Sequence, residues 1–200
     1  MKTTNPKDYI KLIEMFSFTL TKGLLDKEIV IDWADNIINQ DSEPDIFIIE
    51  LSLCGNKSLN DTISLINNYI EQEKSNLSGR VILGFIYRQF LSKKITLRNV
   101  IRTIYDLIWT TDLTEKEKNV IYILDNDFDL AQDGGYGSIE IIELDTLKFL
   151  EIYRDFQIDN FFDWDMLDET IESKIDLLLT TLFNKRIQID NKKGKWWKFW

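Results

Sequence analysis

The sequence predicts an all-α or predominantly α-helical fold, an irregular multi-helix bundle with at most a short strand pair. Apolar residues recur at the three- and four-residue spacing of amphipathic helices along most of the 200 residues. Only two prolines and eight glycines punctuate the chain, fewer than a turn-rich all-β protein needs. Hydrophobic residues make up 44% of the chain, which is ordinary for a globular domain.

The first part of the chain is expected to form three helices whose ends are marked by residues that start or stop helices. Pro6 suits the first turn of a helix that ends at Gly23, and Asp26 is placed to cap the next helix. Pro44 precedes a third apolar run, which stops at Gly55. The apolar positions of these helices are Ile10, Ile13, Phe16 and Leu20, then Ile29, Trp33, Ile37 and Ile38, then Ile46, Phe47, Ile49, Leu51 and Leu53.

Four further helices are expected in the middle of the chain, each after a residue that caps helix N-termini. Ser58, Ser78, Thr96 and Thr114 are these residues, and Ser58 is followed three positions later by Asp61, as in a capping box. The apolar positions behind them are Ile63, Ile66 and Ile70, then Ile82, Phe85, Ile86 and Phe90, then Val100, Ile104 and Ile108, then Ile121, Leu124 and Phe128.

The last part of the chain mixes helical and strand-like patterns. Residues 138–144 and 186–190 are rich in isoleucine and partly alternating, so each is a candidate short strand. Helical spacing returns over 145–156 and 163–183, which gives eight or nine helices in all. No fixed repeat period occurs, which favours a bundle over a solenoid. Residues 1–190 are therefore expected to form a single helical domain, followed by a basic aromatic tail over 191–200.

Histidine is absent and Cys54 is the single cysteine, which limits the chemistry of the chain. Triads that use histidine and histidine-ligated metal sites are excluded, so we expect no enzymatic activity, no catalytic residue, no metal and no cofactor. Cys54 follows an apolar run and is expected to be a small buried hydrophobe. No apolar signal core and no run of about 18 apolar residues occurs, so a cytoplasmic protein without an integral membrane segment is expected.

The acidic residues are unevenly distributed. Residues 112–172 carry 18 acidic and 4 basic side chains, a net charge of −14, whereas the whole chain carries −10. Residues 1–111 are nearly neutral at −1 and residues 173–200 carry +5. A solvated surface explains any single acid, but a field of one sign is better suited to attracting a basic partner.

The densest group of carboxylates is Asp125, Asp127, Asp129 and Asp133. An EF-hand loop that begins at Asp125 requires glycine at its sixth and glutamate at its twelfth position. Leu130 and Tyr136 occupy those positions, so a calcium loop is not expected. A carboxylate-based enzyme or a ligand-binding protein is the alternative, because acids that meet in space leave no local pattern.

The C-terminal tail is unusual because residues 192–200 combine three tryptophans and one phenylalanine with four lysines. We expect the aromatic side chains to fold back onto the bundle while the lysines meet the acidic segment. Peripheral contact with a membrane surface is the alternative, since such residues lie at the headgroup level. Nucleic acid is not expected as a partner, because an acidic protein repels phosphates.

A resemblance to a known family lies near the N-terminus. The residues that carry it are Gly23–Asp26, Trp33–Asp35, Pro44–Ile46 and Glu50–Leu53. This stretch is similar to the opening of small helical bacterial immunity proteins, which are encoded beside secreted polymorphic or contact-dependent growth inhibition toxins. The resemblance covers about 30 residues and carries over no functional position. It implies a non-enzymatic cytoplasmic protein that binds and blocks one toxin.

The expected function is thus an immunity-type inhibitor that neutralises a basic, nuclease-like toxin domain through an acidic surface. Carboxylates would accelerate the encounter, and aromatic side chains would form the desolvated centre of the interface. The expected partner-binding residues are Asp125, Asp127, Phe128, Asp129, Asp133, Tyr136, Asp163, Trp164, Asp165 and Asp168.

Overall fold

The computed structural model describes residues 5–71, 77–134 and 137–196, with side chains through residue 182. Within these ranges the regular structure is entirely helical, so the all-α prediction is confirmed. The nine α-helices described are α1 Ile10–Thr21, α2 Lys27–Ile38, α3 Ile46–Ser52, α4 Leu59–Ile70, α5 Gly79–Leu91, α6 Leu97–Thr110, α7 Glu115–Gln132, α8 Ile139–Glu151 and α9 Trp164–Trp196. Three 3₁₀ helices accompany them: η1 Pro6–Tyr9, η2 Leu53–Asn56 and η3 Ile158–Asp163.

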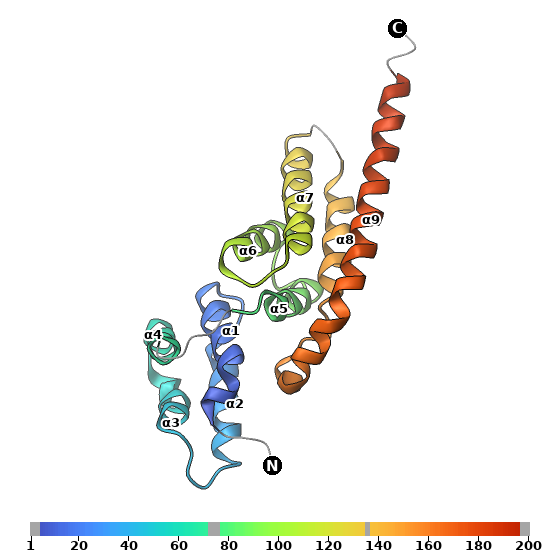
Figure 1. Cartoon of the computed structure of the whole chain (residues 1–200). Helices are drawn as coiled ribbons and strands as arrows, with labels where there is room; N and C mark the ends of the chain where they lie inside the picture. The colour runs from blue at the N-terminus through green and yellow to red at the C-terminus, as the bar shows by residue number, and fades with distance from the viewer. Residues whose placement is uncertain (1–4, 72–76, 135–136, 197–200) are drawn as a thin grey trace.

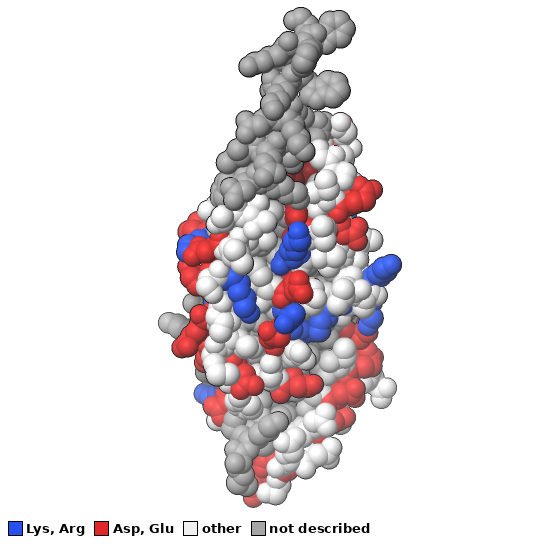
Figure 2. All heavy atoms as spheres, turned by 90° about the vertical axis from the view of Figure 1, so that its right-hand side faces the viewer, with Lys and Arg blue, Asp and Glu red and all other residues white. Residues whose placement is uncertain are grey.

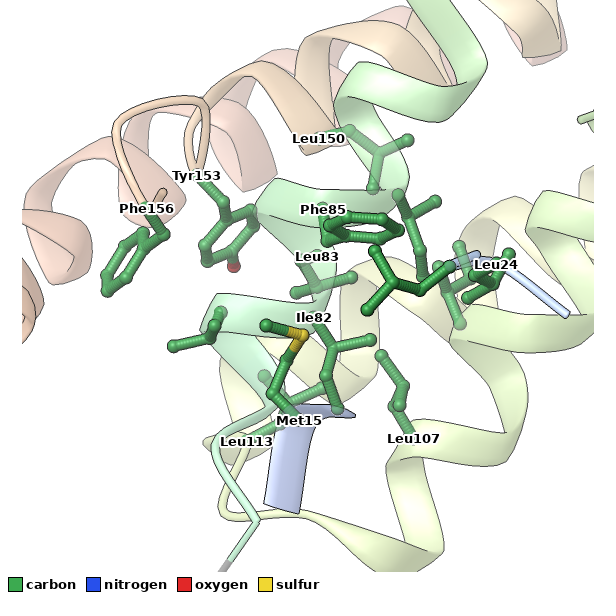
Figure 3. Close-up of a cluster of buried hydrophobic side chains, with 14 of the residues drawn as sticks. Met15, Leu24, Ile82, Leu83, Phe85, Leu107, Leu113, Leu150, Tyr153 and Phe156 are labelled. Atoms are coloured by element: carbon green, nitrogen blue, oxygen red, sulfur yellow. The ribbon is translucent and has the colours of Figure 1, made fainter. Parts of the chain in front are cut away.

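Helix α5 occupies the centre of the arrangement. In Figure 1 it lies between a group formed by α1 to α4 and a group formed by α6 to α9. Its buried residues fall on every side of the helix, as expected for a helix surrounded by others. Figure 3 shows Ile82, Leu83 and Phe85 of α5 packed among buried side chains from both groups, including Met15 and Leu150.

Gly84 allows α5 to approach the chain that follows α8. A Cβ atom at this position would lie 2.4 Å from the carbonyl oxygen of Tyr153 and 3.0 Å from Cβ of Phe156. Real side chains do not tolerate such separations, so a glycine is required for the two segments to touch.

An aromatic cluster joins the N-terminal helices to η3. The Tyr9 ring stacks on Phe161 at 5.3 Å between centroids and meets the edge of Trp33 at 5.4 Å. Trp33 in turn lies edge-on to Phe16 at 5.3 Å. Aromatic pairs at these separations each add about 0.5–1.5 kcal/mol beyond the area they bury. Segments more than 120 residues apart in sequence are thereby held together.

Capping residues set several helix boundaries as the sequence predicted. Ser58 and Asp61 form a full capping box at the start of α4, and Thr114 and Glu117 form another at the start of α7. Thr96 caps α6 by accepting a hydrogen bond from the Asn99 amide at 3.3 Å. Each cap satisfies backbone amides that have no partner inside the helix.

Both expected strands are helical in the structure. Residues 138–144 open α8, where the Ser138 hydroxyl accepts a hydrogen bond from the Ile141 amide at 3.4 Å. Ile142, Phe149 and Leu150 form the buried face of α8, and their spacing has the period of a helix. Residues 186–190 lie within α9, which continues to Trp196 and extends beyond the other helices in Figure 1.

Candidate functional site

Three of the four clustered aspartates follow one side of α7. Asp125 and Asp129 are four residues apart on the helix, and Asp133 at the C-terminal cap continues the same line. Asp125 is half-buried, whereas Asp129 and Asp133 are exposed. Asp127 is half-buried and projects from a different side of the helix, because two residues correspond to about 200° of rotation. We call Asp125, Asp129 and Asp133 the α7 acidic face.

The α7 acidic face has no neutralising ion-pair partner among the residues whose side chains are described. None of the ion pairs among the described residues involves its three carboxylates. Burial raises the pKa of Asp125, and repulsion from the Asp129 carboxylate raises it further. Both effects disfavour the charged form, so this face reduces the stability of the folded protein at neutral pH.

The acids at the start of α9 are arranged differently, because basic side chains from other elements pair with them. Lys11 Nζ lies 2.7 Å from Asp165, and a guanidinium nitrogen of Arg80 lies 3.2 Å from Asp168. Asp163 is the last residue of η3 and is exposed. Asp165 and Asp168 therefore already have cationic partners, which lowers their value as contacts for an external base.

The two groups of acids do not form one site. Arg80 contacts Asp168 and also Glu117, in the first turn of α7. Asp129 lies twelve residues beyond Glu117 on the same helix, which corresponds to about 18 Å. The α7 acidic face is thus a separate surface toward the far end of the helix.

The aromatic residues expected at the centre of an interface are in the core instead. Phe128 is 6% exposed and Trp164 is 2% exposed, and Trp164 Nε1 donates a hydrogen bond to the Gln157 carbonyl at 2.9 Å. Burial keeps both rings from reaching a partner, so they are removed from the candidate contact surface. Tyr136 lies outside the described residues.

A buried polar network that the sequence did not reveal connects α5, α7, the segment after α8, and α9. The Glu117 side chain is fully buried and accepts hydrogen bonds from Arg80 Nε at 2.8 Å and from the Tyr153 hydroxyl at 2.9 Å. The Thr114 amide donates to the same carboxylate at 2.8 Å. Burial raises the pKa of the Tyr153 hydroxyl, and the Glu117 charge adds to this, so Tyr153 remains a donor. The buried Glu117 charge is thus balanced by the Arg80 guanidinium and by hydrogen-bond donors from the same fold. We therefore infer that this network stabilises the fold.

The ionisation of Arg80 and Asp168 reflects this partly buried setting. Burial lowers the pKa of Arg80, but hydrogen bonds and attraction from Glu117 and Asp168 outweigh it, so the pKa rises. Burial raises the pKa of Asp168, although Arg80 acts in the opposite direction.

Neither of the two cavities described is lined by the α7 acidic face. One is a groove of about 430 Å³ between α8 and α9, and the other, of about 230 Å³, lies between η1 and the region of η3. Among the residues whose side chains are described, no group of three or more Asp, Glu, Cys or His is placed to hold a metal ion. Cys54 is buried, and its thiol donates to the Glu50 carbonyl at 3.3 Å.

Among the described residues, no helix combines the length and the apolar character that a membrane span requires. No protein-family model, no curated protein and no solved structure matches this chain.

Proposed function

We propose that this protein is a non-enzymatic, immunity-type inhibitor that binds and neutralises a basic toxin domain in the cytoplasm. The α7 acidic face is the proposed contact surface. The observation that carries the proposal is that its three carboxylates have no cationic partner in the described chain, while acids on α9 do. The resemblance of the N-terminal stretch to immunity proteins supports the same function.

The energetic state of the α7 acidic face favours a cationic partner. The raised pKa of Asp125 means that its charge is held at a cost to the folded protein. A lysine or arginine from a partner would relieve this cost by supplying the missing positive charge. Surfaces that reduce stability in this way are commonly retained for function.

Exposed apolar side chains near the same end of α7 provide the non-polar part of such an interface. Leu130 near the end of α7 is exposed, and so are Ile139 and Ile141 at the start of α8. Because only residues 133–138 separate α7 from α8, these side chains lie at the same end of the helix pair. They replace Phe128 and Trp164 as candidate apolar contacts.

The test uses purified protein as bait in the source cells, followed by binding kinetics with the captured partner. The partner is expected to be basic, and its co-expression with this chain should suppress its toxicity. Its association rate should fall steeply between about 50 and about 500 mM salt, because exposed charges are then screened over shorter distances. The double reversal Asp125→Lys/Asp129→Lys should slow association by about tenfold or more.

A control with the same spacing is available on α2, where Glu28 and Asp32 are exposed acids four residues apart. Glu28→Lys/Asp32→Lys changes the net charge by the same amount but leaves α7 intact. Equal slowing by both double variants would assign the effect to net charge alone. A toxin partner whose binding is indifferent to salt and to the α7 reversal would refute the proposal.

A further inference from the structure

The groove between α8 and α9 has an apolar floor. Ile152 and the buried Leu178 form its floor, and Leu177 lies at its rim. The lining residues from α9 are at positions 174, 177, 178 and 181, which form one side of the helix over two turns. Leu177 is 71% exposed, so a large apolar side chain there faces solvent. The volume of about 430 Å³ falls in the range of sites that bind small molecules.

Basic side chains surround this floor in an otherwise acidic protein. Lys148 and Arg154 lie on the α8 side of the groove and Lys174 lies on the α9 side, and Glu151 is the single acid among the described residues of the lining. Figure 2 looks onto this face of the molecule and shows basic side chains gathered across its middle, interspersed with a few acidic ones. The lining therefore has a net positive charge within a chain of net charge −10.

These cations are available to a ligand. Lys174 makes no ion pair or hydrogen bond with the described residues. Arg154 contacts Glu151 and Asp155 at 3.5 and 3.6 Å, and Lys148 approaches Asp145 only to 4.0 Å. The two Arg154 pairs are exposed and are worth at most about 1 kcal/mol, so a carboxylate from a ligand can compete with them.

We propose that the groove binds a free single-chain amphiphilic anion, a long-chain carboxylate. Its hydrocarbon chain lies along Ile152, Leu177 and Leu178, and its carboxylate meets Lys174 and Arg154. The apolar floor recognises the chain through the area it removes from water, and the cations on both walls recognise the head group. An arginine suits this role because its planar guanidinium pairs with both carboxylate oxygens.

The test is a calorimetric titration of the full chain with dodecanoate below its micelle-forming concentration. Saturable binding at a single site is expected. Dodecyl maltoside, which has the same chain and an uncharged head, should bind about tenfold more weakly. Lys174→Glu and Leu177→Asp should each weaken dodecanoate binding by about tenfold, and Lys174→Gln by a smaller factor. Both positions are exposed, so the fold is expected to survive.

Two control variants carry the same changes elsewhere on the surface. Leu91 is the last residue of α5 and Lys94 follows three residues later, and both are exposed. Lys94→Glu and Leu91→Asp should therefore leave dodecanoate binding unchanged. The proposal is overturned if wild-type protein shows no saturable binding, or if the groove and control variants bind alike. Co-sedimentation with phosphatidylglycerol vesicles that depends on Lys174, without binding of free dodecanoate, would also overturn it. The outcome is independent of Asp125 and Asp129, so it does not decide the proposed inhibitor function.

Discussion

Removing Arg80 from the buried network should destabilise the fold strongly. In Arg80→Met, the fully buried Glu117 carboxylate loses its guanidinium partner and keeps only the donors Thr114 and Tyr153. Leaving a buried charge without its ionic partner costs about 3–5 kcal/mol. The two remaining donors place the expected loss near the lower end, at about 3 kcal/mol. Losing the ion pair between Arg80 and Asp168 adds less than about 1 kcal/mol to this cost, because the Asp168 side chain is 36% exposed and can be solvated by water instead.

The measurement is urea unfolding followed by far-ultraviolet circular dichroism. Lys116→Met is the matched control, because Lys116 bridges Glu172 and Asp176 at 2.9 and 2.8 Å where all three side chains are exposed. This control should lose less than about 1 kcal/mol. Adding Glu117→Gln to Arg80→Met should restore about 1–2 kcal/mol by removing the unpaired charge. The reasoning is refuted if the two single variants are equally stable, or if Glu117→Gln restores nothing.

Two further variants test local features of the fold. Asp125→Asn should be more stable than wild type at neutral pH, because it removes the repulsion between Asp125 and Asp129. Two like charges at this helical spacing cost about 0.2–0.5 kcal/mol, which is the smallest gain expected. Because the folded-state pKa of Asp125 is raised, wild-type stability falls as pH rises through that pKa. The advantage of Asp125→Asn should therefore vanish in acid, and a pH series of unfolding midpoints that shows a constant difference would contradict it. Gly84→Ala should cost about 1–3 kcal/mol through overpacking, while Gly55→Ala, with nothing within 4 Å, should be nearly neutral; equal melting temperatures would contradict this.

Most helices were predictable because their signals are local. Residues that cap a helix and the apolar positions behind them lie within a few turns of one another, as at Ser58 and Thr114. The error at residues 138–144 arose because Ile139 and Ile141 alternate with glutamates, which imitates a strand. Both isoleucines prove to be exposed on α8, and the decisive pattern begins at Ile142.

The candidate site was only partly predictable, for two different reasons. The burial of Phe128 was visible in the sequence, since it follows Leu124 by four residues and Ile121 by seven, and all three lie on the buried face of α7. The pairing of Asp165 and Asp168 was not visible. Lys11 is 154 residues from Asp165, and such contacts follow from tertiary packing, which leaves no periodic pattern.

These pairings change how the acidic segment is understood. In sequence, the acids of 112–172 are equivalent, and their sum of −14 suggests one continuous attractive surface. In the structure, Lys11 and Arg80 pair with acids at the start of α9, so that part of the charge serves the fold itself. A basic partner attracted by the net charge would meet Asp125, Asp129 and Asp133 on α7, which form no ion pair among the described residues, whereas the cations of the α8–α9 groove would repel it. Electrostatic steering toward α7 therefore depends on the α7 acidic face, which is why reversing Asp125 and Asp129 should matter more than an equal change of net charge elsewhere.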